Sequence, residues 1–150
     1  MPKIIQLSLL SILLFTACEE KLKPVVTINP KLKRPISCMK LNQINMEKEV
    51  LDTFNNLYDF NETCDLILSV SYKKDIVCNS TQNVNMKNMG KFPKSYLKLS
   101  LRKGLEIEYT YYIDLYKNVD KEDMKEGFAR LKEDLIKGEF NHPITKPHSQ

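Results

Sequence analysis

The chain has 150 residues, of which 42% are hydrophobic and 28% are charged, and this is typical of one globular domain. Its 23 basic and 19 acidic residues are interspersed along the sequence. Such a mild positive excess argues against nucleic-acid binding, which usually shows a clustered basic surface. With only four glycines, the chain also has no glycine-rich loop for binding phosphate.

The first 17 residues have the layout of an export signal. Lys3 provides a positive charge, residues 4–15 are mostly apolar, and the small residues Thr16 and Ala17 precede Cys18. The apolar run is about a dozen residues long, whereas a membrane-spanning helix needs roughly 20. We therefore expect a cleaved signal and not a permanent transmembrane helix.

This segment resembles the signal peptide of bacterial lipoproteins, although Phe15 stands where those signals usually have Leu. The resemblance implies that residues 1–17 are removed and that Cys18 becomes the lipidated N-terminus. Acyl chains such as palmitate on Cys18 would then anchor the protein in membrane lipid. In the usual sorting rule Asp after the cysteine retains a lipoprotein in the inner membrane. Glu19 therefore favours the periplasmic face of the outer membrane.

We expect residues 18–37 to form the lipidated N-terminus and an extended tether, because they combine basic residues with three prolines. Weak extended patterns occur at 25–28 and within 32–41. The single folded domain should then span residues 38–138. The proline-containing segment 139–150 is expected to be a flexible tail.

Two segments in the first half of this domain have clear periodicity. Met46, Val50, Phe54 and Leu57 recur at helical spacing, which predicts a helix over about 46–59 with Asn45 as its N-cap. From Cys64 the period changes to two, with apolar residues at alternate positions, and this predicts a half-buried strand. Residues 79–94 are rich in Asn and Lys and are expected to form a long loop.

A β-hairpin is the clearest signal in the chain. Leucines alternate with polar residues over 97–101, and apolar residues again alternate over 105–115. Pairing Leu101 with Leu105 would keep every apolar residue on one face. That pairing predicts a three-residue loop, 102–104, with Gly104 in the left-handed region.

A second helix is predicted after Asp120, which is a good N-cap, and it should end near Gly138. The expected fold class is therefore α+β. We expect a two-layer sandwich in which two helices cover one face of an antiparallel sheet of about three to four strands.

Three cysteines remain after Cys18, which suggests one disulfide and one free thiol in an oxidising compartment. If helix 46–59 runs back along the strand that starts at Cys64, Cys38 should lie near the far end of that strand. This layout favours a Cys38–Cys78 disulfide with Cys64 as a buried thiol. A turn at 73–75 would instead favour Cys64–Cys78.

No residue constellation predicts catalysis, a metal site or a cofactor. The two histidines, His142 and His148, lie in the tail beside prolines. Tyr96, Tyr112 and Tyr116 give the outer side of the hairpin an aromatic character and are candidate binding residues. Asn61 is a candidate glycosylation site, because Asp59 precedes it by two positions and Thr63 follows it by two.

The sequence thus predicts a membrane-anchored envelope lipoprotein, not an enzyme, that acts as a binding or assembly accessory module in the periplasm. Its expected partner is an envelope protein or polymer. An inhibitor or immunity lipoprotein that blocks a lytic enzyme is the alternative, since a long loop such as 79–94 suits insertion into an active-site cleft.

Overall fold

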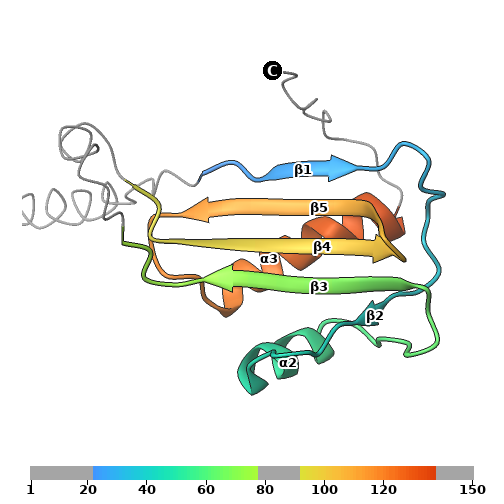
Figure 1. Cartoon of the computed structure of the whole chain (residues 1–150), viewed down its shortest axis with the longest axis horizontal. Coiled ribbons are helices and arrows are strands. Elements are labelled where there is room, and N and C mark those ends of the chain that lie inside the picture. The colour runs from blue at the N-terminus through green and yellow to red at the C-terminus, as the bar shows by residue number, and fades with distance from the viewer. Residues whose placement is uncertain (1–21, 78–91, 138–150) are drawn as a thin grey trace, which may run out of the picture.

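The computed structural model describes residues 22–77 and 92–137. In these ranges five strands form one mixed sheet in the order β1-β5-β4-β3-β2, and the expected α+β class is confirmed (Figure 1). The strands are β1 (Val25–Ile28), β2 (Lys40–Leu41), β3 (Leu66–Lys73), β4 (Ser95–Lys103) and β5 (Glu106–Leu115). The helices are α2 (Lys48–Asn55) and α3 (Lys121–Lys132), and α3 continues into the π-helical turn η4 (Glu133–Lys137).

The core lies between the helices and one face of the sheet. Leu68, Leu99 and Tyr111 are buried on adjoining strands, since alternate residues of a strand share a face. Phe128 of α3 packs edge-on against Phe54 of α2, with ring centroids 5.6 Å apart. Both rings are fully buried in the same hydrophobic cluster, so one core joins α2, α3 and the sheet.

The sheet differs from the expected antiparallel sheet of three to four strands. β1 pairs with β5 in antiparallel register along four residues, so the folded part begins well before residue 38. β2 has only two residues and pairs with β3 in parallel. A two-residue strand has too few positions to display an alternating pattern, whereas β1 coincides with the weak extended pattern at 25–28 in a segment rich in lysine and proline.

The hairpin also differs from the prediction. Lys103 pairs with Glu106, so the turn has two residues, and Gly104 occupies its first position with φ +58°. The left-handed conformation of Gly104 is confirmed, whereas the three-residue loop is wrong. A bulge next to Leu101 restores the alternation, because Leu101 pairs with Tyr109 while Arg102 pairs with Ile107.

The extra residue of the bulge is Glu108. Its side chain is buried and accepts a hydrogen bond of 2.9 Å from Asn29 Nδ2, and its carbonyl oxygen accepts one from the Asn29 amide. The residues between the turn and the bulge lie outside the core: Leu105 is 95% exposed and Ile107 is 46% exposed. The prediction that Leu105 and Ile107 lie on the apolar face is therefore wrong.

Of the two predicted N-caps, the one for α2 is wrong and the one for α3 is confirmed. The N-cap of α2 is Glu47, and Asn45 instead adopts a left-handed conformation with φ 57°. The N-cap of α3 is Asp120, as predicted, and its carboxylate accepts hydrogen bonds from the amides of Glu122 and Asp123. The Asp123 carboxylate in turn accepts a hydrogen bond from the Asp120 amide, which completes a capping box.

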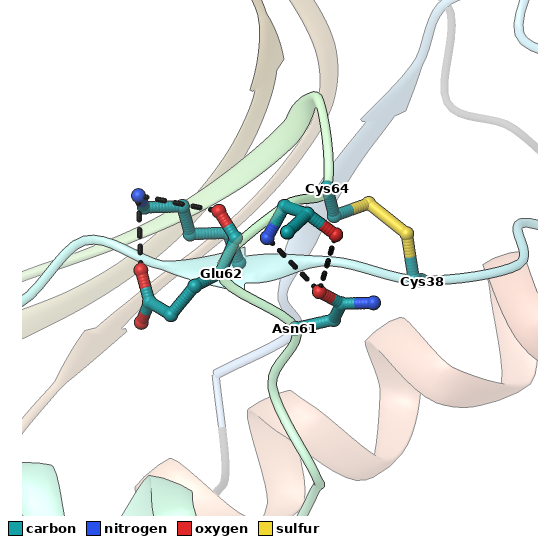
Figure 2. Close-up of a disulfide and its surroundings, with 6 residues drawn as sticks. Cys38, Asn61, Glu62 and Cys64 are labelled. Atoms are coloured by element: carbon teal, nitrogen blue, oxygen red, sulfur yellow. Dashed lines mark hydrogen bonds and ion pairs between the residues drawn. A yellow bond between two sulfur atoms is a disulfide. The ribbon is translucent and has the colours of Figure 1, made fainter.

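The disulfide joins Cys38 to Cys64 and not to Cys78, so the predicted pairing is wrong and Cys64 is not a free thiol (Figure 2). β2, whose parallel pairing with β3 the weak extended pattern within 32–41 did not predict, is the cause. It follows Cys38 closely and runs parallel to β3, with Lys40 opposite Ile67. This register brings Cys38 to the start of β3, where Cys64 lies. Cys78 is outside the described residues.

Candidate functional site

The face of the sheet opposite the core is the candidate site, and we call it the outer face. In Figure 1, α3 passes behind the strands, and among the described residues no helix crosses the near side. The outer face is made by the strand residues that alternate with those of the core. They are Val25, Thr27, Ile67, Ser69, Ser71, Lys73, Tyr96, Lys98, Ser100, Arg102, Ile107, Thr110, Tyr112 and Asp114. All are half-buried or exposed except Ser100, which is buried.

A pair of aromatic rings lies at one end of this face. Tyr96 and Tyr112 occupy diagonal positions on β4 and β5, and their rings stack with centroids 5.8 Å apart and planes inclined by 25°. The Tyr112 hydroxyl donates a 2.7 Å hydrogen bond to Asp114, and this bond together with partial burial raises the pKa of Tyr112 to about 12. Two of the three predicted binding tyrosines are thus brought together.

The third predicted tyrosine, Tyr116, follows the last residue of β5 and is half-buried. It lies beyond the strand positions that define the outer face. The expected site is therefore centred on two tyrosines from adjacent strands, and Tyr116 flanks it.

Three cations lie on the outer face, two of them beside the aromatic pair. Lys98 is directly opposite Tyr112, Lys73 is directly opposite Tyr96, and Arg102 lies further along β4. None of the three makes an ion pair with another residue in ranges 22–77 and 92–137. Asp114 is the only acid among the described residues of the outer face, because Glu108 is buried at the bulge and Glu106, which is opposite Lys103 in the register, alternates with Ile107. The outer face therefore carries a net positive charge.

Small hydroxyl side chains form a row across the middle of the outer face. Thr27 is opposite Thr110, Thr110 is opposite Ser100, and Ser100 is opposite Ser69. Asn42 extends the row beyond β3 by donating a 3.4 Å hydrogen bond to the Ser69 hydroxyl. Short side chains keep this part of the face low, so that the tyrosines and cations project beside a flat polar strip.

A buried polar cluster on the other side of the sheet was not predicted. The hydroxyl of Tyr109 donates a 3.1 Å hydrogen bond to Asp134, whose carboxylate also receives a 2.8 Å contact from Arg130. Burial, and then the charge of Asp134, raise the pKa of Tyr109 above its ordinary value. Because Tyr109 is fully buried, this cluster fastens η4 to the sheet and offers no surface to a substrate. The i,i+4 spacing of Arg130 and Asp134 was its only sequence signal.

A groove of about 360 Å³ lies where α2 and α3 begin. Its lining includes four acids and two lysines, and Lys121 makes a 3.0 Å ion pair with Glu49, which lowers the pKa of that carboxyl. Asp120 and Glu122 pair with Lys117 and Lys125, which lie outside the lining. These ion pairs occupy most of the charged side chains of the groove, which we do not take as the binding site.

The remaining predicted sites divide between described and undescribed residues. Asn61 lies in the exposed loop between α2 and β3. Cys18, both histidines and all but residues 92–94 of the expected long loop lie outside the described ranges. Within those ranges, no three His, Cys, Asp or Glu side chains gather as metal ligands would. None of the described helices has the length and apolar character needed to span a membrane.

Comparison with known proteins finds no matching family model, and no curated protein or solved structure has significant similarity to the chain. Function is therefore inferred from the residues of this chain alone.

Proposed function

We propose that the protein is an envelope lipoprotein, anchored by an acylated Cys18 at the periplasmic face of the outer membrane, and that it acts as a non-enzymatic binding or assembly module. The lipoprotein-like segment that ends at Cys18 supports the anchor. The Cys38–Cys64 disulfide is in keeping with an oxidising compartment outside the cytoplasm.

The binding surface in this proposal is the outer face. We take the fold as a two-layer sandwich whose helices cover one side of the sheet, so that the other side remains available to a partner. The observation that carries the proposal is the stacked pair of Tyr96 and Tyr112 on a face with three cations that lack ion-pair partners in the described part of the chain.

An anionic envelope polymer fits this surface best. Tyrosine rings provide a flat apolar contact for sugar rings, and their hydroxyls provide hydrogen bonds. Lys73, Lys98 and Arg102 complement carboxylate or phosphate groups on such a polymer. The row of serine and threonine hydroxyls supplies further donors and acceptors along the strip between them.

Binding of the detergent-solubilised protein to purified cell-wall sacculi tests this function. We expect co-sedimentation that weakens as salt is raised, since screening reduces attraction between exposed charges. The double substitution Y96A/Y112A should weaken binding about tenfold, which corresponds to ~1.4 kcal/mol. K98E should also weaken binding, whereas K125E, a charge reversal at an exposed lysine of α3 that pairs with Glu122, should not.

Equal loss in K98E and K125E would show that net charge alone drives the association, and would refute the outer face as the binding site. Failure to sediment with sacculi, together with tight binding to a lytic enzyme, would favour the inhibitor or immunity function instead.

A further inference from the structure

The loop between α2 and β3 contains an acidic glycosylation motif. Residues 59–63 read Asp-Phe-Asn-Glu-Thr, so an acid stands two positions before Asn61 and a threonine stands two after it. Bacterial N-glycosylation enzymes require both residues, and neither intervening position is proline. We propose that Asn61 is an N-glycosylation acceptor that receives an oligosaccharide from a lipid-linked diphosphate donor.

The motif is accessible in the folded protein. Asp59, Asn61 and Thr63 are all exposed, and Asp59 makes no ion pair within the described ranges, so its carboxylate is available to an enzyme. Phe60 between them is half-buried, with its ring centroid 5.1 Å from that of Tyr58. The chain is therefore anchored by Phe60 while the three motif residues remain at the surface.

The acceptor amide has a defined orientation. Asn61 Oδ1 accepts a 2.9 Å hydrogen bond from the Thr63 amide and a 2.7 Å hydrogen bond from the Thr63 hydroxyl. These two bonds form an Asx turn, which holds the oxygen of the side chain toward Thr63. Figure 2 shows the Asn61 amide nitrogen on the side away from the two dashed hydrogen bonds that its amide oxygen accepts. This nitrogen, Nδ2, donates no hydrogen bond to any other described residue and is the atom that a glycan must reach.

The surrounding contacts fix the position of the loop. The Asn61 amide donates a 3.0 Å hydrogen bond to the carbonyl of Met39, and the Cys64 amide donates a 3.1 Å hydrogen bond to the carbonyl of Asn61. The Cys38–Cys64 disulfide closes the same region, and Figure 2 shows it beside Asn61. Asn61 thus lies in a tight turn that backbone hydrogen bonds and the nearby disulfide hold in place in the folded protein.

The proposed transfer balances as a substitution at the anomeric carbon of the donor glycan. A bond forms between that carbon and Asn61 Nδ2, and the bond from the carbon to the oxygen of the lipid diphosphate breaks. The amide nitrogen loses one proton to a base of the transferase, and the lipid diphosphate leaves with the electron pair. No oxidant or reductant is required, and the product is a neutral glycosyl amide on the protein surface.

A second Asn-x-Thr sequence gives an internal comparison. Asn79 is followed two positions later by Thr81, but Val77 and not an acid stands two positions before it. Trypsin places the two motifs in separate peptides, 49–73 and 75–87, because lysines occupy positions 48, 73, 74 and 87. One digest therefore reports both positions.

The test is glycopeptide mass spectrometry on the full protein purified from its native cells. We expect a hexose-containing mass increment on peptide 49–73, none on peptide 75–87, and loss of the increment in N61Q and D59A. D65A is the matched control, since Asp65 is an exposed acid in the same loop but outside the motif. T63S should retain the glycan because it retains the hydroxyl.

The modification requires export, and so it rests on the location in the proposed function. The N-terminal peptide is therefore measured in the same sample. A chain that begins at acylated Cys18 but carries a bare Asn61 overturns the glycosylation and leaves the anchor intact. A glycan on Asn79, or a glycan on Asn61 that persists in D59A, also overturns this inference. An uncleaved chain with a bare Asn61 overturns the location and the glycosylation together.

Discussion

The Cys38–Cys64 disulfide should contribute strongly to stability. It closes a loop with a sequence separation of 26 residues, which contains β2 and α2. In the chain-entropy account, a loop of this length stabilises the folded state by about 3.5 kcal/mol at 25 °C. At about 4 °C per kcal/mol for a domain of this size, its loss should lower the melting temperature by about 14 °C.

Thermal and urea unfolding of C78S and of C64S/C78S isolates this contribution, because Cys78 is then unable to replace Cys64 as the partner of Cys38. We expect C78S to keep the disulfide and C64S/C78S to lose about 3.5 kcal/mol of unfolding free energy. Adding C38S to the double variant should cost little more, since the bond is already absent. A loss below about 1 kcal/mol in C64S/C78S, or a missing disulfide in C78S, would refute the pairing.

Substitutions at three further positions test the fold. A Cβ at Gly127 would lie 2.9 Å from Cε1 of the buried Tyr111 ring. In urea unfolding, this clash should lower the unfolding free energy of G127A by about 1–3 kcal/mol, and the better helix propensity of Ala should return ~1 kcal/mol of it. A variant more stable than wild type would contradict the packing of α3. Gly104 has φ +58°, and a Cβ added there would meet no atom within 4 Å. G104A should therefore lose about 1 kcal/mol of unfolding free energy from backbone strain alone, and G104N should lose less. Equal melting temperatures for wild type and G104A would contradict the left-handed turn. D120A should lower the unfolding free energy by about 1 kcal/mol at pH 7. Because Lys117 lowers the pKa of Asp120 to about 2 from 3.8, the difference in stability between D120A and wild type should shrink as the pH falls from 4 to 2. A difference that grows in acid would contradict Asp120 as a charged N-cap.

The helix starts and the hairpin show how far local patterns predict this fold. The N-cap at Asp120 was predictable because the residues that form its capping box are close to it in the sequence. The left-handed conformation of Gly104 was predictable, but the length of its turn was not. The alternation of apolar residues requires one extra residue somewhere in the hairpin, and the sequence favoured the turn as its place. In the protein the extra residue is Glu108, whose buried side chain accepts a hydrogen bond from Asn29.

Long-range pairing was the part that local patterns did not predict. β2 is too short to show a period, and its parallel pairing with β3 decides which cysteine meets Cys38. The aromatic character of the outer face was predictable from alternation on β4 and β5. Its net positive charge was not, because the burial of Glu108 depends on a bulge that local alternation does not predict.

The central claim is that this domain is held in the envelope by a lipid on Cys18, and the intact mass of the membrane-extracted native protein tests it most directly. We expect the mass of the chain from Cys18 to Gln150 plus acyl groups and the glycan proposed for Asn61, and a gain of about two hydrogens on reduction for the disulfide between Cys38 and Cys64. A mass that corresponds to a chain without acyl groups would contradict the lipid anchor.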